Sequence, residues 1–150
     1  MTEATGYAIE ETVFFNTGPL RLEGRLYRAI GLDAVIITHP HPLYGGELDN
    51  PVVAVLTDIY QRLGYTTLRF NFRGVGASRG VYDDGRGEQD DVRAAARYLA
   101  DLGKTVSDLA GYSFGAWVHL HMEPPLPTVR RYLLVAPPVA YMEFNVTTVR

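Results

Sequence analysis

A serine flanked by two glycines is the residue of this chain best suited to chemistry. Ser113 stands in Gly111-Tyr112-Ser113-Phe114-Gly115, which fits the pattern G-x-S-x-G. A serine hydroxyl is a weak nucleophile, so it reacts only where it is exposed, presented to a base and close to N–H groups that stabilise an oxyanion. A sharp turn from a strand into a helix provides that exposure. The pattern therefore predicts a nucleophilic Ser113, with the backbone N–H of Phe114 as an oxyanion donor.

The base that would take the proton from Ser113 is not evident among the four histidines of the chain. His119 and His121 follow the serine on its own helix, so a rise of about 1.5 Å per residue places them roughly 9 and 12 Å along that helix, leading away from the hydroxyl. Two carboxylates follow the serine. We expect Glu123 to cap the nucleophile helix and Glu143 to lie in the short tail, where no histidine is available for it to orient.

Two cofactor alternatives arise from other motifs. His39-x-His41 follows an apolar run and resembles a metal-binding pair, but a metal needs further ligands in the same pocket. The other interpretation of His39 is a buried, hydrogen-bonded loop residue. A glycine pattern at positions 74, 76 and 80 departs from the dinucleotide-binding spacing, and a further loop separates it from the next helix. We therefore predict no metal and no cofactor.

Hydrophobic periodicity indicates the elements that position these residues. Residues 12–15 and 20–28 read as an antiparallel hairpin around a turn at 16–19, and β-branched runs at 34–38 and 66–72 read as strands. Asn50 and Pro51 begin a helix that Gly64 ends, and a second apolar stripe runs from Val92 to Leu102. A strand at 106–112, a helix from 114 to about 122 and a buried strand at 132–137 complete the pattern. This alternation predicts an α/β layered sheet with parallel central strands.

Bulk composition limits the class of protein. With 150 residues, 47% of them hydrophobic, the chain fits one domain spanning 1–150. Its net charge is −3 and its basic residues are scattered, so we expect a small-molecule or peptide-like partner and neither nucleic acid nor an anionic membrane. The absence of cysteine excludes disulfides and thiolate chemistry. No apolar run approaches the ~18 residues of a membrane span, and the expectation is a cytoplasmic protein.

Four motifs together resemble the α/β-hydrolase superfamily, in particular its small lidless serine hydrolases of the dienelactone-hydrolase and acyl-peptidase-like type. They are HPHPLYGG at 39–46, LRFNFRGVGASRG at 68–80, DDGRGEQDD at 83–91 and GYSFGA at 111–116. The resemblance implies a three-layer sandwich with a mostly parallel sheet and an N-terminal antiparallel hairpin. It also implies hydrolysis of carboxylic ester, thioester or small amide bonds through a Ser113 acyl-enzyme.

In this family the loop after the third strand supplies a second oxyanion donor through a backbone N–H. Because Pro40 and Pro42 have no N–H, the donor here is His41 or Leu43, and His41 is the first choice. The resemblance assigns Arg73 and the acidic run at 83–91 to packing and capping. Aromatic candidates for the wall of a substrate pocket are Tyr44, Tyr112, Tyr82 and Trp117, although for Trp117 we expect core packing.

The chain departs from the family pattern after its last predicted strand. The family order is serine, then an acid, then a histidine after the final strand, and here the chain ends before those elements. We therefore expect an incomplete domain and an impaired hydrolase; the alternative is a catalytically inactive remnant or a binding domain. We also expect the strand at 132–137 to form an exposed sheet edge, with low stability or with a partner there, such as a second copy.

Overall fold

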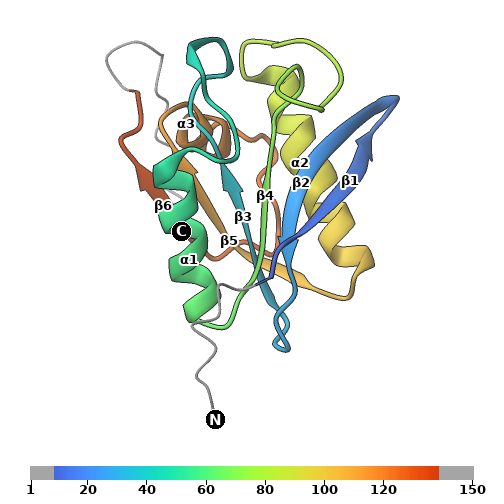
Figure 1. The fold of residues 1–150 in the computed structure, drawn as a ribbon, viewed down its shortest axis with the longest axis vertical. Coiled ribbons are helices and arrows are strands. Elements are labelled where there is room, and N and C mark those ends of the chain that lie inside the picture. The colour runs from blue at the N-terminus through green and yellow to red at the C-terminus, as the bar shows by residue number, and fades with distance from the viewer. Residues whose placement is uncertain (1–8, 139–150) are drawn as a thin grey trace.

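A six-stranded mixed sheet forms the centre of the molecule in a computed structural model that describes residues 9–138 (Figure 1). The strand order is β1-β2-β4-β3-β5-β6. The strands are β1 (Glu11–Thr17), β2 (Leu20–Tyr27), β3 (Asp33–Thr38), β4 (Thr66–Phe70), β5 (Thr105–Tyr112) and β6 (Arg131–Val135). The helices are the 3-10 helix η1 (Pro42–Tyr44), α1 (Pro51–Arg62), α2 (Arg86–Asp101) and α3 (Phe114–Leu120).

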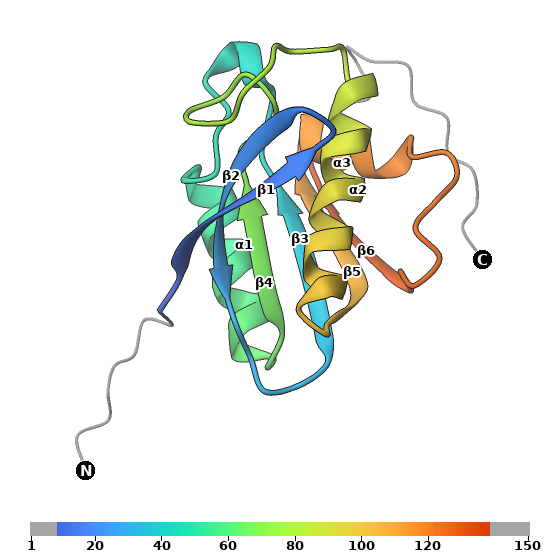
Figure 2. The same ribbon diagram turned by 90° about the vertical axis from the view of Figure 1, so that its right-hand side faces the viewer.

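The predicted topology and layering are confirmed. β1 and β2 form an antiparallel hairpin that joins β4, while β4, β3, β5 and β6 run parallel to one another. Helix α1 covers one face of the sheet, and α2 and α3 cover the other (Figures 1 and 2). None of the helices within residues 9–138 combines the length and the apolar character needed to cross a membrane.

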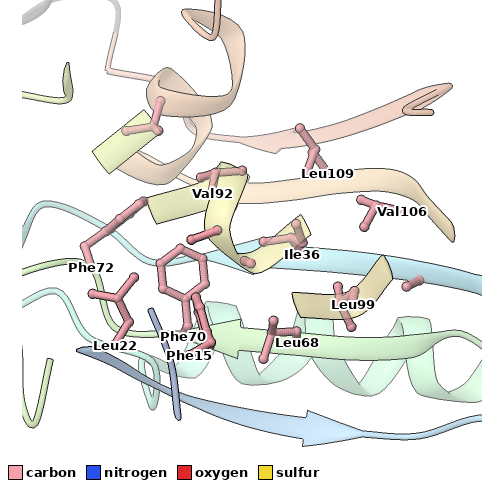
Figure 3. Close-up of a cluster of buried hydrophobic side chains, with 14 of the residues drawn as sticks. Phe15, Leu22, Ile36, Leu68, Phe70, Phe72, Val92, Leu99, Val106 and Leu109 are labelled. Carbon is pink, nitrogen blue, oxygen red and sulfur yellow. The ribbon is translucent and has the colours of Figure 1, made fainter. Parts of the chain in front are cut away.

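The core lies on both faces of the sheet, which explains the uninterrupted apolar run in β3. Ile36 belongs to the larger cluster beneath α2 and α3, and Val35 and Ile37 belong to the smaller cluster beneath α1. Figure 3 draws part of the larger cluster, whose side chains come from strands β1 to β5 and from α2; they include Phe15, Leu22, Ile36, Leu68, Phe70, Val92, Leu99 and Leu109.

Two predictions about the strands differ from the structure. β4 ends at Phe70 rather than Phe72, because the Phe72 N–H donates to the side chain of His39 instead of a neighbouring strand. The last strand was predicted to be buried, which is wrong: β6 is only half-buried and Leu133 is 39% exposed. The reason is its place at the edge of the described sheet, as predicted, with β5 as its strand neighbour on one side.

Helix α2 is fixed at its first turns by the charged residues that sequence reasoning assigned to packing and capping. Glu88 accepts hydrogen bonds from the N–H groups of Asp83 and Gly85, each at 3.0 Å. The Arg73 guanidinium donates to the buried Asp91 carboxylate at 2.8 Å, and the Arg73 backbone N–H donates to the same group. This assignment is therefore confirmed. The contacts tie the loop after β4 to α2.

Two buried histidines sit at the carboxyl end of β3. His39 accepts the Phe72 N–H at Nε2, and its Nδ1 donates to the Pro40 carbonyl at 2.7 Å. His119 of α3 places Nε2 2.9 Å from Thr38 Oγ1. Burial lowers the pKa of each histidine from 6.5 to about 4. The interpretation of His39 as a buried, hydrogen-bonded residue is thus confirmed, and both histidines are neutral at pH 7.

The lowered pKa values of these two histidines predict that the folded protein loses stability in acid. Between pH 6.5 and about 4 the unfolded chain binds their protons and the folded chain does not, so the free energy of unfolding falls as the pH falls. Each histidine contributes a slope of up to ~1.4 kcal/mol per pH unit. Glu88 and Asp91, whose pKa burial raises, act in the opposite direction. Urea unfolding from pH 7 to 4.5, compared with the His119→Gln variant, isolates one histidine; identical slopes in the two proteins would contradict the prediction.

Candidate active site

The predicted turn from a strand into a helix is present at Ser113, between β5 and α3. Ser113 has φ 55° and ψ −114°, a backbone region that residues with a side chain rarely adopt. Its N–H donates to the Val135 carbonyl of β6 at 2.9 Å, which holds the turn to the neighbouring strand. This is the geometry that lifts a serine hydroxyl above the carboxyl edge of a sheet.

Gly111 and Gly115 are required by close backbone packing around this turn. A Cβ at Gly115 would lie 2.6 Å from the Thr38 carbonyl oxygen of β3, and a Cβ at Gly111 would lie 2.7 Å from the backbone of Gly115 itself. Real Cβ atoms do not approach other heavy atoms so closely, so only glycine fits at either position. Both glycines of the G-x-S-x-G pattern therefore serve the same contact between α3, β5 and β3.

Two backbone N–H groups near the turn have no acceptor within residues 9–138. One belongs to Phe114, in the first turn of α3, and the other to His41, in the loop after β3. The Leu43 N–H differs, because it donates to Nδ1 of the His41 ring at 3.2 Å. Of the two loop donors left open by the sequence, His41 is the one whose N–H remains available.

The His41 side chain joins three loops, a role that sequence reasoning missed because it considered only the backbone. Its ring contacts Tyr44 on η1, Tyr82 in the loop after β4, and Phe114 at the turn after β5, with ring centroids 4.7, 4.9 and 5.0 Å apart. We call His41, Tyr44, Tyr82 and Phe114 the aromatic cluster. The available signal was an aromatic or imidazole ring shortly after each of three adjacent strands.

Polar contacts fix the His41 ring within this cluster. Its Nε2 lies 3.0 Å from the Tyr82 hydroxyl, while Nδ1 accepts the Leu43 N–H. Burial lowers the pKa of His41 from 6.5, and the nearby Asp84 charge opposes that change. Burial, followed by the charges of Asp84 and Glu88, raises the pKa of Tyr82 to about 12. At pH 7 the imidazole and the phenol are therefore both neutral.

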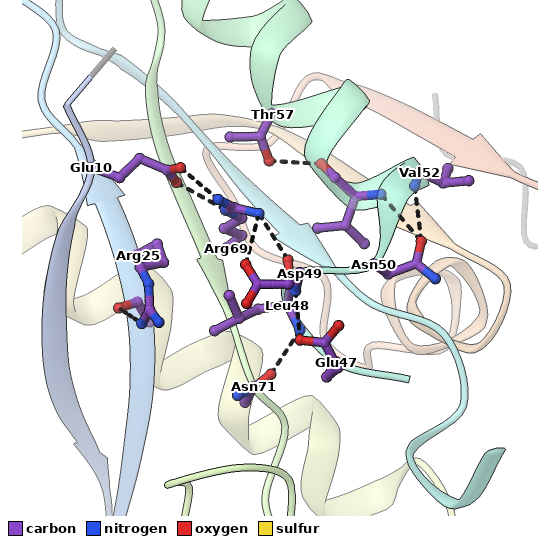
Figure 4. Close-up of polar contacts among 12 residues, drawn as sticks. Glu10, Arg25, Glu47, Leu48, Asp49, Asn50, Val52, Thr57, Arg69 and Asn71 are labelled. Atoms are coloured by element: carbon purple, nitrogen blue, oxygen red, sulfur yellow. Dashed lines mark hydrogen bonds and ion pairs between the residues drawn. The ribbon is translucent and has the colours of Figure 1, made fainter. Parts of the chain in front are cut away.

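The chain beyond η1 is held to β4 by polar side chains (Figure 4). Asn71 Oδ1 accepts the Leu48 N–H at 2.8 Å, and Arg69 donates to the Leu48 carbonyl at 3.0 Å while pairing with Glu10. A Cβ added at Gly46 would lie 2.7 Å from the His41 carbonyl oxygen, so a side chain does not fit there. The loop at 39–46 is therefore fastened at both ends.

A polar groove of about 470 Å³ opens beside this loop. Glu23, Arg25, Glu47 and Asp49 contribute charged groups to its lining, along with Asn71. Tyr44 and Tyr112, the predicted pocket residues, do not line this groove: Tyr44 is 86% exposed on η1 and Tyr112 is half-buried at the end of β5.

The other residues singled out from the sequence lie away from Ser113 or serve packing. Trp117 stacks on Phe114 and on His121, which confirms its expected role in the core. Glu123 was expected to cap the nucleophile helix, which is wrong, because α3 ends at Leu120 with His121 as its C-cap. Glu143 lies outside the described residues. In the described part of the chain the Ser113 hydroxyl makes no hydrogen bond.

The His39-x-His41 pair is engaged in structural hydrogen bonds rather than directed at a common point. Both ring nitrogens of each histidine have partners in the protein. No group of three metal-ligating side chains comes together within the part of the chain that the structure describes. The turn after β5 instead places Ser113 beside the N–H of Phe114, and the ring of Phe114 contacts that of His41 in the loop after β3.

Comparison with known protein sequences finds one similar protein. No protein-family model matches the sequence. The uncharacterized protein RP471 of Rickettsia prowazekii (strain Madrid E) is 40% identical over 131 residues, which are 85% of this chain and 55% of that protein. The chain thus spans little more than half the length of this relative.

Solved structures resemble the chain over nearly all of its length. A protein of unknown function from Agrobacterium tumefaciens, ATU1826, is 35% identical with a TM-score of 0.84, and the match covers 93% of this chain and 66% of that one. An α/β serine hydrolase homologue from Coxiella burnetii is 38% identical with a TM-score of 0.77, covering 91% and 67%. XC6422 from Xanthomonas campestris, a serine hydrolase without a lid, is 32% identical with a TM-score of 0.79, covering 94% and 66%. The mixed sheet of this chain, its serine turn between two glycines and these similar structures together show that the chain belongs to the α/β-hydrolase superfamily.

Proposed function

We propose that this chain carries the nucleophile and the oxyanion site of a serine hydrolase acting on carboxylic ester, thioester or small amide bonds. The observation that carries the proposal is the positive φ of Ser113, held at a turn where neither flanking glycine can be replaced. Such strain persists where the surrounding packing enforces it, and it is concentrated at functional sites. The serine hydrolase homologue from Coxiella and the serine hydrolase from Xanthomonas among the similar structures support the same assignment.

In the proposed reaction Ser113 Oγ attacks the carbonyl carbon of the substrate. The carbonyl oxygen becomes an oxyanion that accepts hydrogen bonds from the N–H groups of Phe114 and His41. Collapse of this intermediate breaks the bond to the leaving group, which takes up a proton, and leaves an acyl-Ser113 ester. Water then attacks the ester and releases the acid. His41 enters through its backbone, since both of its ring nitrogens are already engaged.

The proton of Ser113 requires a base that residues 9–138 do not supply. His39 and His119 are buried and hydrogen-bonded, His41 is held by Tyr82 and Leu43, and His121 lies at the far end of α3. Loss of the histidine in a serine hydrolase costs on the order of 10⁶ in kcat, while the oxyanion site retains about 10³–10⁴ over water. The described residues by themselves are therefore a slow hydrolase.

The alternative function is a binding domain in which the turn at Ser113 persists only as architecture. The lack of a base for Ser113 within residues 9–138 favours this binding function. The two functions differ in the reactivity of a single hydroxyl, which makes them separable by a covalent probe.

A fluorophosphonate probe tests the proposed function directly. We expect slow labelling that approaches one probe per chain, located on Ser113 by peptide mass spectrometry. The Ser113→Ala variant loses the label because the attacking oxygen is gone. Ser107→Ala, at the opposite end of β5, is the matched control and retains it. A folded protein that takes up no probe after prolonged incubation would favour the binding domain.

The glycine packing gives an independent prediction. Gly115→Ala places a methyl group against Thr38, so α3 must shift and carry Ser113 and Phe114 with it. A displacement of this kind costs about 10²-fold in reactivity, and overpacking costs ~1–3 kcal/mol in stability. Labelling rates and thermal melts measure the two effects. Gly31→Ala, where the nearest atom to the new methyl group is 3.7 Å away, is the control with neither effect. Equal labelling of Gly115→Ala and the unchanged protein would refute the coupling.

A further inference from the structure

Tyr82 and His41 form a hydrogen-bonded pair between two loops that are far apart in sequence. The Tyr82 hydroxyl lies 3.0 Å from His41 Nε2, and the rings are 4.9 Å apart. The other ring nitrogen, Nδ1, accepts the Leu43 N–H at 3.2 Å and so caps η1. A continuous chain of contacts therefore runs from the loop after β4 to the first turn of η1.

Hydrogen-bonding rules determine where the imidazole proton lies. A backbone N–H can only donate, so Nδ1 must be the acceptor for Leu43. A neutral imidazole carries one N–H, which places the proton on Nε2, directed at the oxygen of the Tyr82 hydroxyl. This tautomer follows from the contacts of both ring nitrogens. It leaves the phenolic proton of Tyr82 free to donate elsewhere.

We propose that Tyr82 is a positioning residue for the oxyanion site: by holding His41 as the Nε2–H tautomer, it keeps the Leu43 N–H bound to Nδ1 and leaves the His41 backbone N–H as the loop's free donor. The inference rests on the proposed function for its catalytic consequence only. The tautomer and the contact with Leu43 are properties of the folded chain and can be measured whether or not Ser113 reacts.

The surroundings of Tyr82 suit this role. Its ring packs on Phe114, 5.9 Å between centroids, and Phe114 is fully buried. The residue follows Gly80, whose φ of 88° turns the loop back, and its backbone N–H lies 3.2 Å from the position of a Cβ at Gly74. The Tyr82 backbone therefore lies against Gly74 of the same loop. Tyr82 thus links the serine turn and the loop at 39–46.

Protonation of His41 breaks the contact with Leu43. A proton on Nδ1 would face the Leu43 N–H, and two donors cannot share a hydrogen bond. The charged or titratable groups that face the pair are Asp84 in the loop just before α2, Glu88 in the first turn of α2 and Tyr44 on η1. Because burial lowers the pKa of His41, the contact persists at neutral pH and is lost only on acidification below 6.5.

The tautomer is tested by ¹⁵N NMR of protein labelled at histidine. We expect the Nδ1 of His41 to show the shift of an unprotonated nitrogen at pH 7.5 and to become protonated on acidification. The Tyr82→Phe variant removes the acceptor for Nε2–H, so His41 becomes a mixture of tautomers. Tyr98→Phe deletes the same hydroxyl from a tyrosine on α2 that stacks on Phe15, and it leaves the His41 spectrum unchanged.

Hydrogen exchange of the Leu43 amide measures the consequence for the loop. We expect Tyr82→Phe to speed this exchange about fivefold, the usual net worth of one hydrogen bond. In the His41→Asn variant the shorter side chain can still accept the N–H two residues on but cannot reach Tyr82. In the His41→Asn background we expect Tyr82→Phe to leave the exchange rate of the Leu43 amide unchanged. If Tyr82 only stabilised the loop by packing, Tyr82→Phe would speed this exchange in both backgrounds.

Fluorophosphonate labelling links the pair to the reaction. We expect Tyr82→Phe to slow labelling of Ser113 about fivefold to tenfold, less than the 10²–10³ lost when a donor is removed outright. A His41 protonated at Nδ1 in the unchanged protein, or unaltered Leu43 exchange in Tyr82→Phe, overturns the inference. Failure of the unchanged protein to label, with the NMR results as expected, overturns the proposed function and leaves the tautomer assignment standing.

Discussion

The contact between α3 and β3 at Thr38 is the constraint on which the site depends. Gly115 packs against the Thr38 backbone, and His119, one helical turn later, places its Nε2 2.9 Å from the Thr38 hydroxyl. Residues four apart lie on the same face of a helix, so Gly115 and His119 both contact Thr38 from one face of α3. With α3 held so close, the chain has no room for a relaxed connection from β5, and Ser113 takes the positive φ.

The aromatic cluster transmits this constraint to the other loops. Phe114 is fully buried immediately after Ser113, and it touches both His41 and Tyr82. Phe114 therefore contacts the loop after β3 and the loop after β4. The ion pair of Arg73 with Asp91 anchors the second of these loops to α2, where a charge without its partner would cost several kcal/mol. The proposed oxyanion donors are backbone groups of Phe114, which is buried in the core, and of His41, whose ring contacts Phe114.

The sequence predicted the architecture well, because apolar periodicity and the glycines report directly on burial and backbone conformation. Strands buried on both faces, such as β3, and the cap at Asn50 are local signals. The errors arose where tertiary contacts decide. His39 draws the Phe72 N–H out of β4, and β6 is half-exposed because of its place in the sheet. The role of the His41 ring was missed because it depends on Tyr82, forty-one residues away, and no local pattern reveals that pairing.

Two local costs on α3 bear on whether its serine turn is functional or only architectural. The positive φ of Ser113 costs ~1–3 kcal/mol relative to a residue such as glycine. Nearby, Nδ1 of the buried His119 has no hydrogen-bond partner among residues 9–138, which costs a further ~1–3 kcal/mol. A glycine at position 113 would relieve the first of these costs. Local conflicts of this kind are expected at functional or strained sites. The strained backbone of the half-buried Ser113 therefore supports the proposed nucleophilic role.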